Sequence, residues 1–228
     1  MSQPKNPHTI VIKNEYYPKG LREIDVWNYY QKVKMQLLKE TLGKTIMVFF
    51  AVDENKFIVI RKNKSEGLVR LNMTDYDDVV SGRSVSFHNI MNKYSGYGVI
   101  DIDTDNFEIS KSLAIEIYDL FYEQQVVRDV KIIYTGKDSF HVRVYFHNDY
   151  KIDYIKSMIL GILSKAKFVN DFTIKAKRQG NIPNLDLQRN IYNAGFIALH
   201  SLSIDGLKCM EIEPKKIRWF KKEQAKIL

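Results

Sequence analysis

Residues 97–105 read Tyr-Gly-Val-Ile-Asp-Ile-Asp-Thr-Asp, an apolar run that ends in acidic residues. The apolar residues predict a buried strand, and successive side chains of a strand point to opposite faces. Asp101 and Asp103 therefore share one face, about 7 Å apart. Carboxylates this close repel each other unless a cation lies between them, and hard oxygen ligands suit Mg²⁺ or Mn²⁺. A strand that simply ends in an acidic turn explains the same stretch, so both interpretations stay open here.

Helices and strands alternate after this strand. Apolar residues at helical spacing predict helices over about 110–125 and 153–168. Alternating and apolar runs predict further strands at 130–134, 140–146, 185–187, 195–200 and 208–212. This order of elements predicts an α+β fold, in which helices pack on one face of a mixed or antiparallel sheet.

The first part of the chain predicts a second layer beside this sheet. A helix over about 22–42 ends at Gly43, and a strand pair follows at 45–51 and 57–61. Residues 62–96 are polar and rich in turns, with a short strand near 67–71. We expect a single domain over residues 1–228. Its parts are an N-terminal α/β layer at about 1–96, the main sheet at 97–213, and a basic tail helix from about Pro214 to residue 228.

The positive charge lies in the last third of the chain. Residues 1–150 carry no net charge, whereas residues 151–228 carry the whole formal charge of +8, part of it in a basic loop at 169–183. A basic segment beside acidic candidate ligands predicts a polyanionic partner, such as nucleic acid or a nucleotide. A solvated lysine-rich surface would give the same charge. The 14 Tyr and 12 Phe residues could stack on bases.

The single cysteine, Cys209, excludes an internal disulfide framework and a cysteine-rich zinc site. The N-terminal residues have no long apolar stretch typical of a signal peptide, and no apolar run reaches about 18 residues. We therefore expect an intracellular, soluble protein with no membrane partner.

Two further clusters contain residues that suit phosphate chemistry. The turn 135–139 is small and polar, so its backbone N–H groups and hydroxyls can bind phosphate oxygens. His141 follows it, on the strand face opposite the valines. Asp186 lies between leucines, and Arg189 comes three residues later. Taken separately, His141 suits a hydrogen-bonded structural histidine, and the acid with its arginine suits a structural ion pair.

Taken together, the three clusters resemble the archaeo-eukaryotic primase superfamily. Its members carry an Asp-x-Asp strand, then a small-x-His strand, then a lone Asp on a later strand. The matching segments here are Asp101-Ile102-Asp103, Ser139-Phe140-His141 and Asp186. Several segments look closest to the polymerase domain of bacterial and archaeal end-joining ligases. These are Tyr17-Pro18-Lys19-Gly20 with Asp25 and Tyr29-Tyr30, and residues 135–142, 186–190 and 198–203. The resemblance spans roughly residues 16–213.

The resemblance implies a role for each matching residue. Asp101, Asp103 and Asp186 would bind two divalent ions, Mg²⁺ or Mn²⁺. His141 and Arg189 would hold the triphosphate of an incoming nucleotide. Thr135 stands where the family usually has Ser, and Ser139 stands where the end-joining group often has Gly. Lys137 and Ser201 are weaker candidates for phosphate contact. The family fold is a sheet of the RNA-recognition-motif type with packed helices and an N-terminal α/β layer.

The implied activity is that of a primase-polymerase. Such a nucleotidyltransferase adds ribonucleotides or deoxynucleotides to a 3′-hydroxyl on a DNA template and releases pyrophosphate, in DNA replication or repair. Its metals neutralise the attacking and leaving oxygens. Expected partners are template, primer and nucleotide, and a larger polypeptide or accessory subunits such as a ligase or helicase. Replicative primase small subunits usually carry a cysteine and histidine zinc site, which a chain with one cysteine cannot build. A non-catalytic nucleic-acid-binding module and a metal-dependent nuclease are the alternatives.

Overall fold

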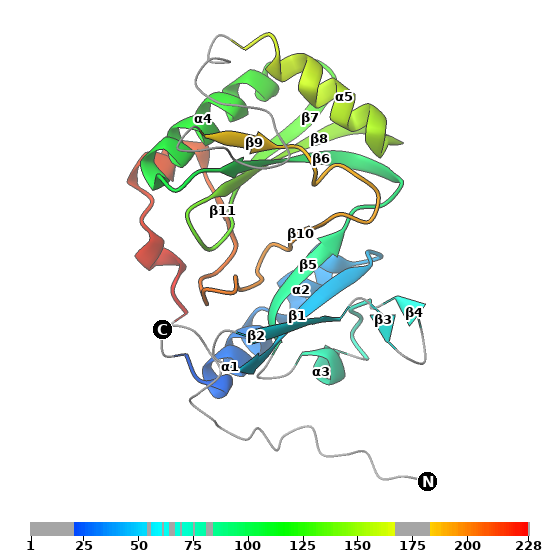
Figure 1. Ribbon diagram of the computed structural model, residues 1–228, viewed down its shortest axis with the longest axis vertical. Coiled ribbons are helices and arrows are strands. Elements are labelled where there is room, and N and C mark those ends of the chain that lie inside the picture. The colour runs from blue at the N-terminus through cyan, green and yellow to red at the C-terminus, as the bar shows by residue number, and fades with distance from the viewer. Residues whose placement is uncertain are drawn as a thin grey trace.

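The computed structural model describes residues 21–53, 56–60, 62–63, 67–68, 70–74, 76–80, 84–166 and 183–227. These residues form two layers, each built on an antiparallel sheet (Figure 1). The helices are α1 (Glu23–Lys32), α2 (Lys34–Thr41), α3 (Tyr76–Val79), α4 (Phe107–Tyr122) and α5 (Ile152–Leu163). The strands are β1 (Ile46–Asp53), β2 (Lys56–Ile60), β3 (Lys62–Asn63), β4 (Gly67–Leu68), β5 (Ser84–Ile90), β6 (Tyr94–Asp103), β7 (Val127–Tyr134), β8 (Phe140–Lys151), β9 (Asn184–Asp186), β10 (Gly195–Ile197) and β11 (Met210–Ile212).

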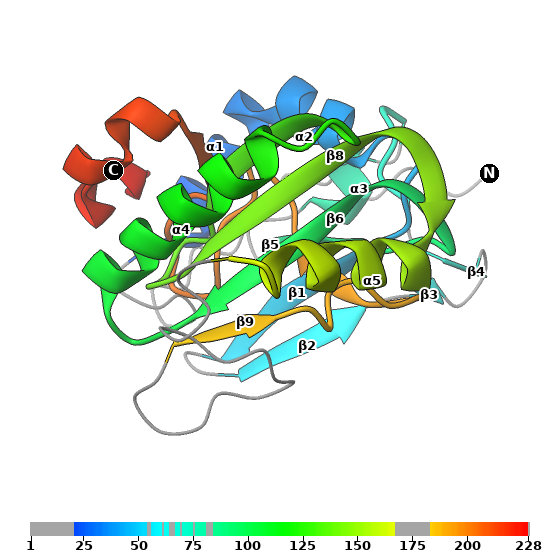
Figure 2. The same ribbon diagram turned by 90° about the horizontal axis from the view of Figure 1, so that it is seen from above.

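The main sheet has five strands in the order β11-β7-β8-β6-β9. Helices α4 and α5 lie over one face of it (Figure 2). The apolar side chains on that face, among them Ile102, Val142 and Ile132, are buried against the helices. Because side chains alternate, the polar residues of the same strands face the other layer. The predicted α+β fold, with helices packed on one face of the sheet, is confirmed.

The N-terminal layer contains a four-stranded sheet in the order β10-β5-β1-β2, with α1 and α2 packed beside it (Figure 1). The predicted placement of the strand near 195–200 in the main sheet is wrong. β10 pairs with β5, so that Ile197 lies opposite His88. At Gly195 a Cβ would meet the end of the Met47 side chain, which reaches across from β1, so glycine leaves room for that side chain. The chain therefore returns to its first layer after completing the main sheet.

Two predicted helices differ from those observed. The helix over 22–42 is interrupted at Val33, which has φ −99° and ψ 11° and packs against the N-terminal core. The tail helix is instead a pair of 3₁₀ helices, η3 (Pro214–Trp219) and η4 (Lys222–Ala225). Extended backbone at Phe220 separates them and lets that ring enter the main core.

The predicted segment 17–20 and the basic loop at 169–182 lie outside the described residues. Within the described ranges, no helix is both long and apolar enough to cross a membrane.

Candidate functional site

Three strands bring the predicted carboxylates to one place. β6 lies between β8 and β9, and Asp101 is paired with His141 on one side and with Asp186 on the other. Side chains directly opposite each other on antiparallel strands point to the same face, with Cβ atoms about 5 Å apart. Asp103 lies two residues further along the same face, opposite Asn184. The register therefore gathers residues that are up to 85 positions apart in the chain.

Asp101 is at the centre of this cluster and is almost fully buried. Its Oδ2 accepts hydrogen bonds from Nε and Nη2 of Arg189, at 3.2 and 3.1 Å. Its Oδ1 lies 3.5 Å from Nε2 of His141. Burial opposes ionisation, but the two basic neighbours outweigh it and hold the pKa of Asp101 below its usual value. Asp101 is therefore ionised and already paired with the side chains of Arg189 and His141.

Asp186 has the opposite electrostatic situation. Burial raises its pKa, and the charges of Asp101 and Asp103 raise it further. The N–H of Gln188 donates to its Oδ1 at 2.7 Å and opposes the shift only in part. Crowded negative charge of this kind is what a divalent cation relieves, so the donor chemistry fits Mg²⁺ or Mn²⁺. Among the described residues, however, no three Asp, Glu, His or Cys side chains are arranged so that they could together hold a metal ion.

The loop between β7 and β8 lies at the same end of the sheet as Asp103, because Ile102 pairs with Phe140. Its two ends are joined: the hydroxyl of Thr135 lies 2.9 Å from the carbonyl and 2.7 Å from the hydroxyl of Ser139. Lys137 is exposed at the tip of the loop. The predicted hydroxyls and the lysine thus lie beside the carboxylate cluster.

His88 also belongs to the site, although we had placed it in a polar, turn-rich segment. It lies on β5 of the other layer, and burial lowers its pKa to about 3, assisted by the charges of Arg189 and His141. The alternation of Val85 and Phe87 around it was the available signal for a strand. Nδ1 of His141 is buried and has no hydrogen-bond partner among the described residues.

Ser201, predicted as a weaker candidate for phosphate contact, lies outside the site. It is fully buried, and its hydroxyl accepts a hydrogen bond from the N–H of Phe87 at 2.7 Å. The Ser201 hydroxyl donates to the carbonyl of Leu202 at 3.0 Å, and the hydroxyl of Tyr30 lies 3.5 Å from it. These contacts fix the segment after β10 against the N-terminal layer and leave no free hydroxyl for a phosphate. We therefore remove Ser201 from the candidate phosphate ligands.

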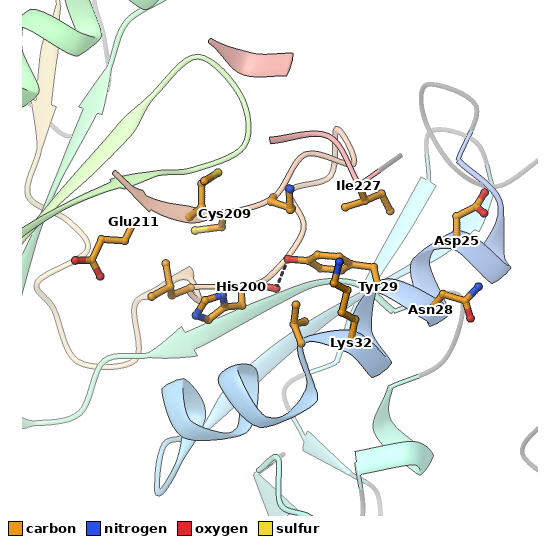
Figure 3. Close-up of a pocket in the computed structure, with 12 residues that line it drawn as sticks. Asp25, Asn28, Tyr29, Lys32, His200, Cys209, Glu211 and Ile227 are labelled. Carbon is orange, nitrogen blue, oxygen red and sulfur yellow. Dashed lines mark hydrogen bonds between the residues drawn. The ribbon is translucent and has the colours of Figure 1, made fainter. Parts of the chain in front are cut away.

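A pocket of about 580 Å³ lies elsewhere, between α1 and the segment before β11 (Figure 3). The hydroxyl of Tyr29 crosses it and donates to the carbonyl of His200 at 2.9 Å. No predicted site residue lines this pocket. Both acidic residues that line it, Asp25 and Glu211, are paired, with Arg22 and Lys131 respectively. It is therefore separate from the carboxylate cluster.

The sequence matches no protein-family model and no curated protein. The structure is similar to the polymerase domain of Ligase D from Mycobacterium tuberculosis, solved in complex with DNA. The TM-score is 0.75 at 10% sequence identity, over 95% of this chain and 92% of the other. At this identity the likeness establishes the fold alone, and the chain has the fold of that polymerase domain.

Proposed function

We propose that this chain is a metal-dependent primase-polymerase, which adds nucleotides to a 3′-hydroxyl on a DNA template. The observation that carries the proposal is the register at Asp101. His141 flanks it on β8, Asp186 flanks it on β9, and Arg189 is bonded to it. The shared fold with a polymerase domain supports placing this chemistry on this sheet.

Asp101, Asp103 and Asp186 would hold the divalent ions. When bound, such ions supply charge neutralisation on the triphosphate and a lowered pKa for the attacking hydroxyl. Arg189 neutralises Asp101 in the structure described here, and its side chain is 41% exposed. It can therefore leave Asp101 and turn its planar guanidinium toward a phosphate, which it binds through two parallel hydrogen bonds.

The remaining candidates would position the triphosphate. His141 presents one imidazole nitrogen to Asp101 and keeps the other unpaired within the described structure, so a nucleotide could supply the missing partner. Lys137 and the hydroxyls of Thr135 and Ser139 lie at the end of the sheet to which Asp103 points. Phosphoryl transfer depends mainly on such positioning and on charge stabilisation.

The nucleic acid would bind through basic and aromatic side chains. The net charge of +8 lies in residues 151–228, and phosphate contacts by lysine and arginine dominate the affinity for DNA. The structural neighbour was solved with DNA, which supports a DNA substrate.

A second candidate is a non-catalytic nucleic-acid-binding module with the same fold. One observation favours it. Within the described residues, Asp101 is paired with Arg189, and no three acidic, histidine or cysteine side chains are arranged so that they could hold a metal ion. Both candidates predict DNA binding, but only the first predicts metal-dependent synthesis.

The deciding experiment offers a labelled primer–template, a gapped duplex and a bare single strand, each with ribonucleotides or deoxynucleotides and Mg²⁺ or Mn²⁺. We expect metal-dependent product with release of pyrophosphate. DNA binding without product on every substrate would favour the binding module. Degradation of the strands instead of extension would favour a nuclease.

Asp101→Ala and Asp186→Ala should each abolish synthesis, by about a thousandfold or more, because the metals lose a ligand. DNA affinity, measured by fluorescence anisotropy, should stay within about twofold because it depends on basic side chains. Asp119→Ala removes an exposed carboxylate from α4 and is the matched control, which should be fully active. Wild-type extension by either site variant would refute the metal assignment.

A further inference from the structure

The loop at residues 135–139 is held by three parts of the chain. Three consecutive residues in it are each fixed by a different side chain. These contacts are Ser203 Oγ donating to the carbonyl of Gly136 (2.7 Å), the Tyr134 hydroxyl donating to the carbonyl of Lys137 (2.6 Å), and the Lys222 ammonium paired with the carboxylate of Asp138. A short polar loop with this many contacts keeps a single shape.

The two carbonyl contacts determine where the loop presents its N–H groups. In a trans peptide the N–H points away from the preceding carbonyl. Since the carbonyls of Gly136 and Lys137 are bonded to the protein, the N–H groups of Lys137 and Asp138 point away from those contacts. No group in the described residues accepts a hydrogen bond from either N–H. Successive free N–H groups of this kind bind anions well.

Asp138 conflicts with that role, because its carboxylate would repel a triphosphate bound at the same loop. Lys222, more than 80 residues later, places its ammonium on this carboxylate. The two side chains are only one-third exposed, so solvent screens their charges incompletely. The ion pair therefore turns an unfavourable charge in the loop into a neutral one.

The C-terminal segment is anchored where this contact requires it. The segment runs beside α4 and then toward α1 (Figure 1). Phe220 packs against Tyr134 and Phe140, the residues on either side of the loop, with ring centroids at 4.9 and 6.2 Å. The carbonyl of Ala225 accepts a hydrogen bond from the N–H of Lys208 at 2.8 Å. Lys222 lies between these two anchors, and its ammonium is also 5.0 Å from the centroid of the Phe107 ring.

We propose that Lys222 is a positioning residue of the nucleotide site, which cancels the charge of Asp138 so that the 135–139 loop can bind phosphate. The C-terminal segment is then part of the nucleotide-binding machinery rather than a simple extension of the fold. This inference rests on the proposed function, because it takes the loop to be the triphosphate site.

The test is the affinity for dATP with Mg²⁺, measured by titration calorimetry on the whole chain. Lys222→Ala should raise the dissociation constant about tenfold, because an unmasked carboxylate then faces the phosphates. Asp138→Asn should bind as well as wild type or better. The double variant should return to within about twofold of Asp138→Asn, and the effect of Lys222→Ala should shrink at high salt. Lys216→Ala, which removes an exposed lysine paired with Glu213 in the same segment, is the matched control.

The Asp138→Asn variant separates charge cancellation from a purely structural ion pair. If the ion pair only held the loop in shape, removing either partner would abolish it. Asp138→Asn would then weaken dATP binding as much as Lys222→Ala does. That result, or unchanged binding in Lys222→Ala, would overturn the role of Lys222 while leaving the proposed function intact. Failure of the wild-type protein to bind dATP would instead overturn the proposed function, and this inference with it.

Discussion

Two arginine–carboxylate pairs lie on the face of the main sheet that meets the N-terminal layer, and they differ in how deeply the arginine is buried. Arg143 on β8 donates to Glu40 of α2 at 2.8 Å, and its side chain is 2% exposed. Arg189 donates to Asp101 at 3.1 Å, but its side chain is 41% exposed. Each arginine also donates to a carbonyl of β10, Arg143 to that of Ile197 at 2.8 Å and Arg189 to that of Gly195 at 3.2 Å.

The same chemical pair thus serves two purposes. Burial opposes the ionisation of Glu40, but Arg143 and Lys44 outweigh it and lower its pKa, just as His141 and Arg189 do for Asp101. What differs is access to solvent. A buried pair cannot exchange its partner without leaving a charge unpaired, whereas a half-exposed arginine can turn to a ligand at little cost. Burial, more than residue type, assigns Arg143 to stability and Arg189 to the site.

Breaking the buried pair should have the largest effect on folding. Arg143→Met removes the closer cation of the buried Glu40 carboxylate and leaves only Lys44, at 3.7 Å, which should cost about 3 kcal/mol of unfolding free energy. Urea unfolding followed by circular dichroism measures the loss. The double variant Arg143→Met/Glu40→Leu should recover part of the loss, because the carboxylate is gone and only Lys44, which is 25% exposed, loses its partner. A loss below about 1 kcal/mol in the single variant would show that Arg143 contributes no more than a surface pair.

Breaking the half-exposed pair should affect ligand binding more than folding. Arg189→Met should cost less than Arg143→Met in the same unfolding experiment, because His141 still lies 3.5 Å from the Asp101 carboxylate and the Arg189 side chain is already 41% exposed. The Michaelis constant for the nucleotide should rise about tenfold or more, since a charged two-point contact to phosphate is lost. Steady-state primer extension separates that constant from the turnover number. If Arg189→Met instead unfolds the protein and leaves nucleotide affinity unchanged, the two arginines have the same role.

The sequence predicted the local part of this site and the order of its pieces. Alternation over a few residues predicts the Asp101–Asp103 strand and the histidine strand, and the family resemblance adds the lone Asp186 and the order of the three pieces. The structure adds the register, in which Asp101 is paired with His141 and Asp186. Register depends on packing between distant segments, which a single sequence does not specify.

The errors have the same origin. β10 joins β5 of the first layer through a pairing over more than 100 residues, so nothing local distinguishes it from a strand of the main sheet. Ser201 follows β10 and is buried with it, and His88 becomes a site residue only because β5 lies against β10. Likewise, nothing near Arg143 in the sequence indicated that its partner would be Glu40 of α2. Contacts between the two layers account for each of these cases.

Acidic pH should also distinguish the two pairs, with a smaller effect on the unfolding free energy than the arginine substitutions have. Glu40 and Asp101 both have a lower pKa in the folded state, so the unfolded chain binds more protons in acid. The stability that each carboxylate adds is therefore complete above its unfolded pKa of about 4 and is lost as the pH falls below it. Removing the charge removes that part of the pH dependence, and the buried pair should contribute the larger part. Between pH 5 and pH 3, in EDTA, Glu40→Gln should reduce the fall in unfolding free energy by more than Asp101→Asn, because the arginine paired with Glu40 is 2% exposed and the arginine paired with Asp101 is 41% exposed. Equal effects from the two variants would mean that the exposure of the arginine does not separate the two pairs. Arg189 would then stabilise the fold through Asp101 as Arg143 does through Glu40.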